Sequence, residues 1–443
     1  MLHIVKSINS ILWGYILIFL LCGTGIYFTI LLKGVQIRKF KDGFKRTFGG
    51  IKLKGDAAGK EGMSSFQALA TAIAAQVGTG NLAGAATAIA SGGPGAIFWM
   101  WLSAFFGMST LFSEAILAQV YKEKVDGEVT GGPAYYIKKG LGSNALAVFF
   151  SISIILALGF MGNMVQSNSI GTAFSNIFGI SPIFVGIILS IIAAFIFIGG
   201  IKRIASVTEK IVPIMAAFYI IGGLFIIIRN IDSFIPALKM IFVGAFNPKA
   251  ATGGLIGATV KQAVRYGVAR GLFSNEAGMG STPHAHAVAK VKHPAEQGVV
   301  GIISVFIDTF IVLTITAFVI LTTGALDGKT TGITLTQNAF VKGMGSFGGY
   351  FIAISLLFFA FSTIIGWYFF GEANVKFLFG NKGLLPYRIL VVVFIALGTT
   401  LEVPLVWELS DMFNGFMVIP NLIALIALSK VVKKSLNEYE NLK

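Results

Sequence analysis

Stretches of about 20 mainly apolar residues recur along the whole chain, and each is long enough to cross the hydrocarbon core of a membrane as a helix. Charged residues make up only 12% of the sequence and apolar ones 55%, whereas a soluble domain carries about 25% charged residues. This composition excludes an ordinary soluble protein. Eleven candidate spans lie near residues 11–32, 65–91, 96–120, 145–175, 182–200, 207–228, 253–286, 298–323, 347–371, 385–401 and 405–431. We expect an all-α membrane protein with eleven transmembrane helices.

The positive charges indicate how the chain sits in the membrane. The net charge is +15, and lysines and arginines crowd the connection 33–64 and every second connection after it. Cytoplasmic connections are enriched in these residues. We therefore expect a plasma-membrane protein with its N-terminus outside and its C-terminus in the cytoplasm. No basic stretch alternates with exposed aromatic residues, so nucleic acid is not an expected partner, and the single cysteine, Cys22, offers neither a disulfide nor a thiolate metal site.

Two of the spans, 65–91 and 253–286, carry glycine, asparagine, serine and charges where the others are plain Leu, Ile and Phe. Each opens a group of five spans, and because five is odd the two groups have opposite orientations. Inverted repeats that begin with glycine-interrupted helices are typical of secondary transporters with a site at the membrane midplane. We expect this division: an N-terminal helix and basic connector (1–64), a first repeat (65–229), an extracellular connection (230–252), a second repeat (253–432) and a cytoplasmic tail (433–443).

The interruptions have a second interpretation. Gly80 and Gly84 form a small-xxx-small pair, which commonly allows two helices to pack closely without binding a ligand. Two such motifs at equivalent positions favour a shared binding site, because unwound backbone at membrane depth needs polar partners. The chain has no G-x-x-x-x-G-K-[ST] phosphate loop, so we expect transport driven by an ion gradient. Neither charged rings of a channel nor a catalytic constellation is evident, and we do not expect an enzyme.

Four strings carry a family resemblance: QVGTGN at 76–81, GPG at 93–95, GGPAYY at 131–136 and GLFSNEAGMG at 271–280. With them the chain resembles the alanine or glycine:cation symporter family over essentially its whole length. That family resembles the leucine-transporter fold. The resemblance implies inverted five-helix repeats and uptake of small neutral amino acids together with sodium.

The resemblance also implies a substrate site. Backbone N–H groups around Thr79, Gly80 and Asn81 would hold the carboxylate, and carbonyl groups near Gln76, Phe273 and Ser274 would hold the ammonium group. Gln166 would hydrogen-bond the substrate or, equally, link two helices. Large side chains would limit the pocket to a hydrogen or methyl side chain. The expected substrate-binding residues are Gln76, Thr79, Gly80, Asn81, Gln166, Phe273, Ser274, Gly278, Met279 and Trp367.

A sodium site of this fold uses carbonyl groups of the first broken helix and two hydroxyl groups of the third helix in the second repeat. The matching positions are Ala74, Val77, Ser362 and Thr363. Carbonyl and hydroxyl oxygens suit a hard cation, although adjacent Ser and Thr can also bond within their own helix. A second sodium site would need Asn81 and Ser274.

We therefore expect a sodium-coupled symporter that imports alanine and glycine by alternating access, with sodium as coupling ion, no cofactor and no obligate protein partner. The alternative is a proton-coupled amino-acid permease of the same fold, in which Glu276 would titrate. Ionisable residues at membrane depth need partners, and besides Glu276 they are Glu114, Arg265, Arg270, Asp308, Glu408 and Asp411. His284 and His286 lack a nearby third ligand and are expected to be polar packing residues rather than a metal pair.

Overall fold

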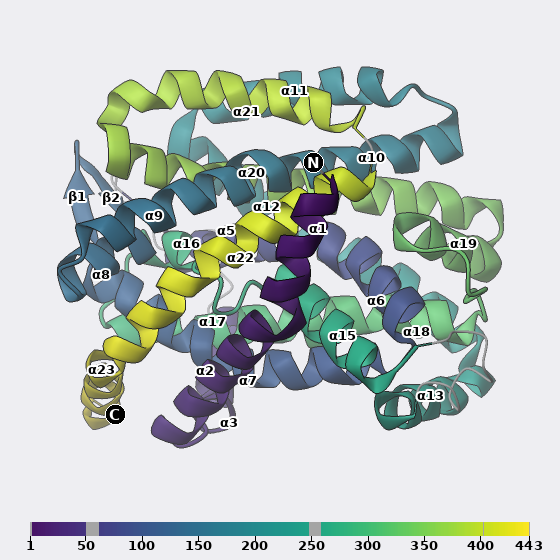
Figure 1. Ribbon diagram of the computed structural model, residues 1–443, viewed down its shortest axis with the longest axis horizontal. Helices are drawn as coiled ribbons and strands as arrows, with labels where there is room; N and C mark the ends of the chain where they lie inside the picture. Colours follow the sequence, from purple (N-terminus) through teal and green to yellow (C-terminus); the bar gives the residue numbers. More distant parts are fainter. Residues whose placement is uncertain (1, 50–61, 248–257, 402, 443) are drawn as a thin grey trace.

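The computed structural model describes the chain except residues 1, 50–61, 248–257, 402 and 443, and the side chains of residues 15, 403 and 404. The described part is almost entirely helical (Figure 1). Seven helical stretches in it are long and apolar enough to cross a membrane: Leu2–Leu31, Ala96–Val120, Asn144–Phe178, Gly200–Arg229, Pro294–Thr322, Ser346–Gly398 and Leu405–Ala427. A mostly helical fold with several apolar helices of membrane-spanning length is therefore confirmed.

The four remaining predicted spans are broken, short or joined to a neighbour. The spans 65–91 and 253–286 are interrupted helices, and 182–200 corresponds to a 17-residue helix, Pro182–Ile198. The span 385–401 follows its predecessor through a 3₁₀ turn at Gly380–Gly383. A total of eleven crossings thus remains a prediction.

The N-terminal part comprises a long interrupted helix and two short helices of the basic connector. These elements are α1 (Leu2–Ile11), η1 (Leu12–Ile16), α2 (Leu17–Leu31), α3 (Val35–Arg38) and α4 (Phe40–Phe48). The helix begins at Leu2, nine residues before the predicted span, and a π-helical stretch at η1 interrupts it. Part of the predicted connector, 50–61, lies outside the described residues.

The first predicted repeat contains a short hairpin besides its helices. Its elements are α5 (Ser65–Gln76), η2 (Gly80–Gly84), α6 (Ala85–Gly92), α7 (Ala96–Val120), β1 (Glu123–Val125), β2 (Glu128–Thr130), α8 (Pro133–Gly140), α9 (Asn144–Ile154), η3 (Ile155–Gly162), α10 (Asn163–Phe178), α11 (Pro182–Ile198) and α12 (Gly200–Arg229). Strands β1 and β2 pair antiparallel. Asp126 and Gly127 connect them with φ of 50° and 83°, as a tight Asp-Gly hairpin turn requires.

The second predicted repeat follows η4 (Ile231–Ser233) and α13 (Phe234–Phe246), which lie within the predicted extracellular connection. Its elements are α15 (Val260–Asn275), α16 (Pro283–Ala287), α17 (Pro294–Val305), η5 (Phe306–Leu313), α18 (Thr314–Thr322), α19 (Gly332–Met344), α20 (Ser346–Phe379), η6 (Gly380–Gly383), α21 (Leu384–Gly398), α22 (Val403–Ala427) and α23 (Ser429–Asn441). Helix α23 begins four residues before the predicted tail.

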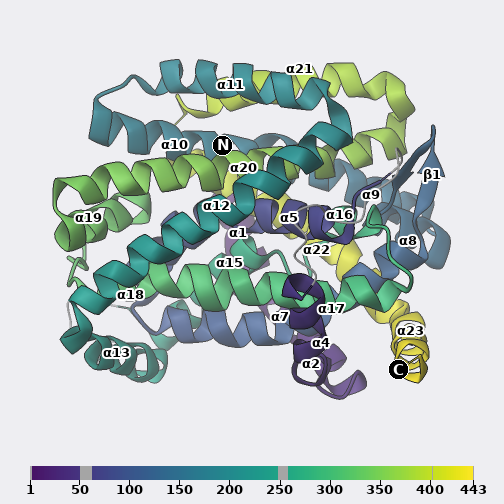
Figure 2. The ribbon, with the colours of Figure 1, turned by 180° about the vertical axis from the view of Figure 1, so that it is seen from behind.

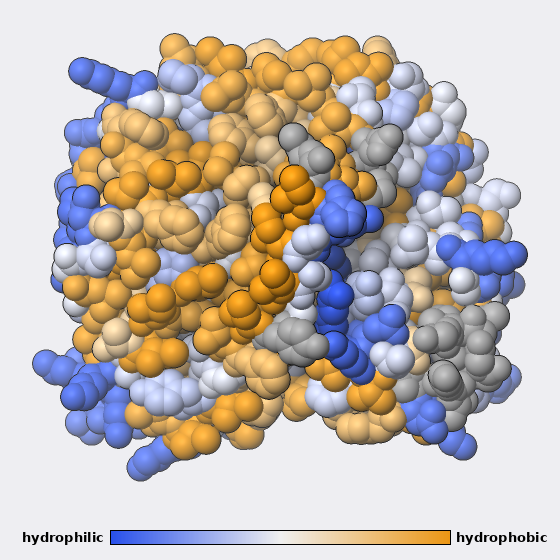
Figure 3. All heavy atoms as spheres, in the orientation of Figure 1, coloured by the Kyte–Doolittle hydropathy of each residue, from blue (hydrophilic) through white to orange (hydrophobic). Residues whose placement is uncertain are grey.

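The helices pack around α20, which contacts α5, α10 and α12. Helices α11 and α21, which occupy matching places in the two groups, lie side by side along one edge of the molecule in both views (Figures 1 and 2). Hydrophobic residues cover much of the face in Figure 3, and hydrophilic residues gather at its left and right edges and along a streak to the right of its centre. Apolar side chains of α11 and α12 are exposed, among them Phe195 and Ile221, because in a membrane protein lipid takes the place of water around such surfaces.

Both interrupted segments begin with the same local signal. Ser64 and Gln67 form a capping box at the start of α5, and Thr259 and Gln262 form one at the start of α15. In each box the hydroxyl group accepts from a backbone N–H that has no partner within the helix, while the glutamine side chain reaches back to the capping residue. The two segments therefore start alike before each reaches its interruption.

Candidate functional site

The first interruption lies between α5 and the π-helical stretch η2. Helix α5 ends at Gln76, and Val77 is extended, with φ of −82° and ψ of 92°. The backbone N–H of Gly78 donates to Asn81 Oδ1 at 2.9 Å, and that of Thr79 donates to Gln166 Oε1 at 3.2 Å. The glycine-rich stretch is fully buried. Since unpaired backbone groups are costly at membrane depth, these two side chains stabilise the interruption.

The second interruption begins where α15 ends at Asn275 and lasts until α16 begins at Pro283. Glu276, Gly278 and Gly280 have positive φ angles of 58°, 84° and 83°, which a continuous right-handed helix excludes. The N–H groups of Gly278 and Gly280 donate to the Glu114 carboxylate of α7, at 3.0 and 2.9 Å. Glu114 thus supplies acceptors to the unwound backbone.

The two interruptions meet inside the molecule. A β-carbon added at Gly80 would lie 2.9 Å from Ser274 Cα, which shows that the two backbones approach too closely there for a larger residue. Beside this contact, Gln76 Nε2 donates to the carbonyl oxygen of Asn275 at 2.7 Å. Gly80 therefore allows close helix packing, which was the second interpretation of the Gly80–Gly84 pair. Its packing partner is α15, the other interrupted helix.

A carboxylate joins the interruptions at this meeting point. Asp308, in the π-helical stretch η5, accepts from Asn81 Nδ2 at 2.7 Å and from the Ser274 hydroxyl group at 2.9 Å. It also accepts from the Thr309 hydroxyl group at 2.8 Å. All of these partners are neutral donors, and no cationic side chain pairs with Asp308 among the described residues. The sequence showed Asp308 as an isolated acid within an apolar span but gave no indication of its partners.

Four predicted sodium ligands converge at the end of α5. The Thr363 hydroxyl group lies 2.9 Å from the carbonyl oxygen of Ala74 and 3.4 Å from that of Val77, and the Ser362 hydroxyl group lies 3.4 Å from Ala74 O. Both hydroxyl groups also bond to Phe359 O within α20, the local bonding that the sequence left open. The absence of a side chain at Gly78 permits this approach, because a β-carbon there would lie 2.3 Å from Thr363 Oγ1.

The aromatic residues of the predicted pocket form a wall on the second interruption. The Trp367 indole N–H donates to the Glu276 carboxylate, and its ring meets Phe273 edge to face at 5.8 Å. Ser281 also donates to Glu276, at 2.6 Å. Glu276 thus stabilises the interruption through neutral donors.

Two predicted substrate residues lie elsewhere around the second interruption. A side chain at Gly278 would point toward Leu21 of α2, 2.8 Å away, rather than toward the first interruption. Met279 is buried in the core beside it. The structure therefore brings together the other eight predicted substrate residues, but it does not bring Gly278 or Met279 to them.

Among the buried polar atoms that lack a hydrogen-bond partner in the described residues, three lie on the first interruption or on the neighbouring helix α10. They are Gln76 Oε1, Thr79 Oγ1 and Asn163 Oδ1. A buried polar group without a partner costs about 1–3 kcal/mol, so native proteins rarely leave such groups unpaired. Gln76 and Thr79 flank the first interruption, and Asn163 lies one helical turn before Gln166. These atoms are available to a polar ligand.

A hollow of about 260 Å³ lies between the first interrupted helix, α15 and α22. Ala83 and Thr87 line it from the first interrupted helix, and Arg270 from α15 and Trp407 from α22 line it opposite. Arg270 pairs with Asp411 through two hydrogen bonds, of 3.0 and 2.5 Å. The guanidinium group also lies 5.0 Å from the centre of a Trp407 ring. The guanidinium group lies 5.9 Å from the centre of the Phe273 ring, so the ion pair is next to both the hollow and Phe273.

Both histidines of the second interrupted segment have hydrogen-bond partners. His284 bonds to Ser281 O and Asn374, and His286 bonds to Gln297. No group of three or more metal-ligating His, Cys, Asp or Glu side chains occurs in the described part of the chain. Glu408 accepts from Asn9 Nδ2 at 2.6 Å, so the N-terminal helix contacts α22.

The arrangement of the helices resembles that of a solved structure. The crystal structure of MhsT in complex with L-phenylalanine superimposes with a TM-score of 0.61, covers 84% of this chain and 90% of its own, and shares 14% of its residues. That likeness establishes the fold, which is of the leucine-transporter type predicted above. Because the chain also matches a family of sodium:alanine symporters over its whole length, the molecule is a membrane transport protein and not an enzyme.

The sequence comparisons identify the family. The model of the sodium:alanine symporter family matches residues 1–443. The sodium/alanine symporter AgcS of Methanococcus maripaludis is 44% identical over 98% of this chain and 97% of its own length. In Bacillus subtilis, the putative sodium/proton-dependent alanine carrier protein YrbD is 42% identical (100% and 93% covered) and the probable sodium/glutamine symporter GlnT is 44% identical (99% and 90% covered). The chain belongs to the sodium:alanine symporter family, as its motifs predicted.

Proposed function

We propose that the protein imports alanine and glycine together with sodium, by alternating access of two inverted five-helix repeats. The observation that carries the proposal is the contact of the two interruptions at Gly80 and Ser274. Oxygen atoms and a carboxylate surround this contact. A secondary transporter places substrate and coupling ion at such a junction.

The proposed substrate site uses the first interruption. The N–H groups of Gly80 and Asn81 begin a helical stretch, where the first donors have no partner within the helix and the dipole favours an anion. They would bind the substrate carboxylate. The N–H of Thr79, which the sequence assigned to the same task, already donates to Gln166. Gln76 Oε1 and Thr79 Oγ1, buried acceptors without partners in the described residues, would bind the ammonium group.

Sodium would bind where Thr363 and Ser362 approach the end of α5. Val77 is extended, and Ala74 lies in the last turn of α5, where carbonyl groups have no partner within the helix. Together with the two hydroxyl groups they offer four neutral oxygen ligands, which suit a hard cation. The ion would join α5 to α20, and its binding would therefore favour one arrangement of the two repeats.

Asp308 is proposed as the negative charge that favours cations at the junction. The predicted second sodium site needed Asn81 and Ser274, and both side chains donate to this carboxylate. Asn81 Oδ1 already accepts from Gly78 N–H, which leaves Asp308 and Ser274 as the oxygen ligands at this position. A cation here would offset the buried charge, which is otherwise held only by neutral donors.

The Arg270–Asp411 pair is proposed as the gate between the hollow and the site. With the N-terminus outside, α15 would run inward from the extracellular connection, so the hollow would face the extracellular side. Separation of the two charges would open a path to Phe273. Closure would exclude water while the opposite side opens.

A proton-coupled permease of the same fold is the alternative. Glu276 lies in the second interruption, and it contacts Trp367 and Ser281 but no cationic side chain in the described structure. The relative YrbD is named as a sodium/proton-dependent alanine carrier protein. In this alternative Glu276 would take up and release a proton during each cycle.

Uptake into proteoliposomes distinguishes the two proposals. Labelled alanine or glycine is offered while the sodium gradient and the pH gradient are varied independently. Accumulation that requires inward sodium at constant pH supports sodium coupling, and accumulation driven by the pH gradient without sodium supports the alternative. Labelled glutamine, the substrate named for a relative, tests the expected limit on size.

A further inference from the structure

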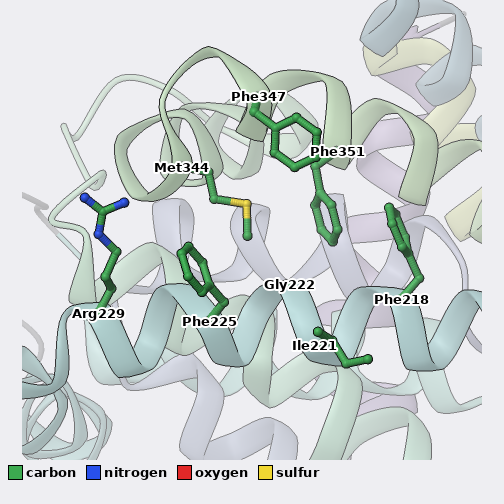
Figure 4. A pocket seen from close by; sticks show the side chains of 8 residues that line it. All are labelled: Phe218, Ile221, Gly222, Phe225, Arg229, Met344, Phe347 and Phe351. Atoms are coloured by element: carbon green, nitrogen blue, oxygen red, sulfur yellow. The ribbon is translucent and has the colours of Figure 1, made fainter.

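A groove with an unpaired cation at one end lies on the apolar surface of the described structure, apart from the proposed site residues, none of which lines it. It has a volume of about 500 Å³ and lies between α12 and the α19–α20 corner (Figure 4). Apolar side chains line it: Phe218, Ile221, Phe225, Met344, Phe347 and Phe351. We call it the Arg229 groove, after the only charged residue in its lining.

The groove is built into the packing of the two helices. Gly222 forms its floor, because a β-carbon there would lie 2.2 Å from the Phe351 ring. The absence of that atom lets the ring lie against the backbone of α12, where it stacks on Phe218 at 4.5 Å. Phe225 and Phe347 stand beside this floor with exposed fractions of 51% and 63%. The depression is therefore fixed by a glycine and its aromatic neighbours.

The length of the groove corresponds to one leaflet of a bilayer. Phe218 and Arg229 are eleven residues apart on a continuous helix, or about 16 Å at 1.5 Å per residue. One leaflet provides about 15 Å of hydrocarbon, half of the usual 30 Å core. Arg229 is the last residue of α12, so the charge lies at the end of the span, where lipid headgroups begin.

Arg229 has no partner to neutralise it within the described residues. It is exposed and forms no ion pair or hydrogen bond there. In Figure 4 its guanidinium group stands at the end of the row of aromatic side chains. A planar guanidinium group binds phosphate through paired hydrogen bonds. The groove thus combines an apolar channel of acyl-chain length with a phosphate-binding group at the interfacial end.

We propose that the Arg229 groove binds an anionic phospholipid, with an acyl chain along Phe225 and Phe351 and the headgroup phosphate on Arg229.

A second copy of the chain fits the groove less well than a lipid does. A two-fold axis in a bilayer runs along the membrane normal, so a symmetric contact through this face would place Arg229 near its own copy. Like charges in such a contact repel each other.

The test measures lipid binding to the purified full-length protein. Native mass spectrometry follows retention of phosphatidylglycerol and phosphatidylcholine from an equimolar mixture, and a phosphatidylglycerol with a diazirine in its acyl chain identifies the labelled residues. Wild type is expected to prefer phosphatidylglycerol by about tenfold, equivalent to about 1.4 kcal/mol, and to be labelled at Phe225 or Met344. Arg229→Gln should remove the preference but keep the labelling.

Matched variants complete the test. Lys239→Gln removes an exposed charge from the helix that follows α12 and should keep the preference. Ile221→Trp fills the groove and should reduce labelling at least fivefold, while Ile228→Trp, an exposed position of α12 outside the lining, should not. An unchanged preference in Arg229→Gln, labelling outside the groove, or a second protein copy cross-linked through it would overturn the proposal.

Discussion

The hydroxyl group of Thr363 lies 2.9 Å from the carbonyl oxygen of Ala74, although 289 positions separate the two residues in the chain. Gly78 makes the contact possible, since any side chain there would occupy the position of the hydroxyl group. A pairing of α20 with the interrupted α5 thus depends on one small residue. The pairing places the Thr363 hydroxyl group beside backbone carbonyl groups at the end of α5 that have no hydrogen-bond partner within the helix.

Replacement of Thr363 by valine is expected to raise the sodium concentration for half-maximal alanine uptake at least tenfold. The variant keeps the shape of the side chain but removes one of four proposed sodium ligands. Because a hydrogen bond to a charged group contributes about 1.5–3 kcal/mol, we expect a loss of similar size in the free energy of sodium binding. Uptake in proteoliposomes over a range of sodium concentrations measures the effect. Thr322→Val, where the hydroxyl group bonds only to Phe318 O within its helix, is the control. An unaltered sodium response in Thr363→Val would remove this hydroxyl group from the ion site.

Asp308→Asn is expected to weaken alanine binding at least tenfold in the presence of sodium. The change removes the negative charge, and the new amide must face donors from Asn81 and Ser274. Equilibrium binding of labelled alanine to the purified protein is the measurement, with thermal unfolding followed in parallel. Asp232→Asn, at an exposed position of η4, should bind normally. If the Asp308 variant folds and binds as wild type does, the carboxylate has no part in cation binding.

The interruptions could be predicted from sequence, but their partners could not. Gly78, Gly80 and Asn81 are poor helix formers at a depth where unpaired backbone is costly, so local chemistry already indicates a break. Asp308, by contrast, is a single acid in an apolar span, and nothing near it in the chain shows that it faces Asn81. Its importance arises only when η5 packs against both interruptions.

The same distinction applies to the second interruption. The string 271–280 indicated both the family and the break, yet Gly278 was expected at the substrate and instead faces α2. A glycine signals freedom of the backbone, but it does not show which direction the unwound chain takes. The π-helical stretches η2, η3 and η5 were equally hidden, because a single extra residue in a helical turn leaves no clear pattern in an apolar sequence.

Phe273→Leu is expected to relax selectivity toward larger amino acids. The ring forms an edge-to-face contact with Trp367 beside the junction, and the smaller side chain would leave room for about one or two methylene groups. Each buried methylene contributes about 0.8 kcal/mol, so the ratio of alanine to 2-aminobutyrate uptake should fall about fourfold. Competition against labelled alanine measures the ratio. Phe318→Leu, on α18, should retain the wild-type ratio, and a retained ratio in Phe273→Leu would place the ring outside the pocket.

The proposed gate can be followed with a single thiol, since Cys22 is the only cysteine in the sequence. In a Cys22→Ser background, Thr172→Cys places a thiol in the hollow. Sodium with alanine should slow its reaction with an impermeant thiol reagent at least threefold, because closure restricts access. Asp411→Asn should abolish this protection by releasing Arg270. Glu408→Gln, whose carboxylate accepts from Asn9, is the control, and equal protection in both variants would exclude the pair as a gate.

Glu114→Ala is expected to destabilise the protein by about 2–6 kcal/mol. The change leaves the N–H groups of Gly278 and Gly280 without acceptors, and each buried unpaired donor costs about 1–3 kcal/mol. Glu114→Gln keeps one carbonyl acceptor, so its free energy of unfolding should fall by about half as much. Denaturant unfolding in detergent, followed with and without alanine, measures both effects. If the two variants are as stable as wild type, water or another side chain accepts the hydrogen bonds of Gly278 and Gly280, and Glu114 does not stabilise the second interruption.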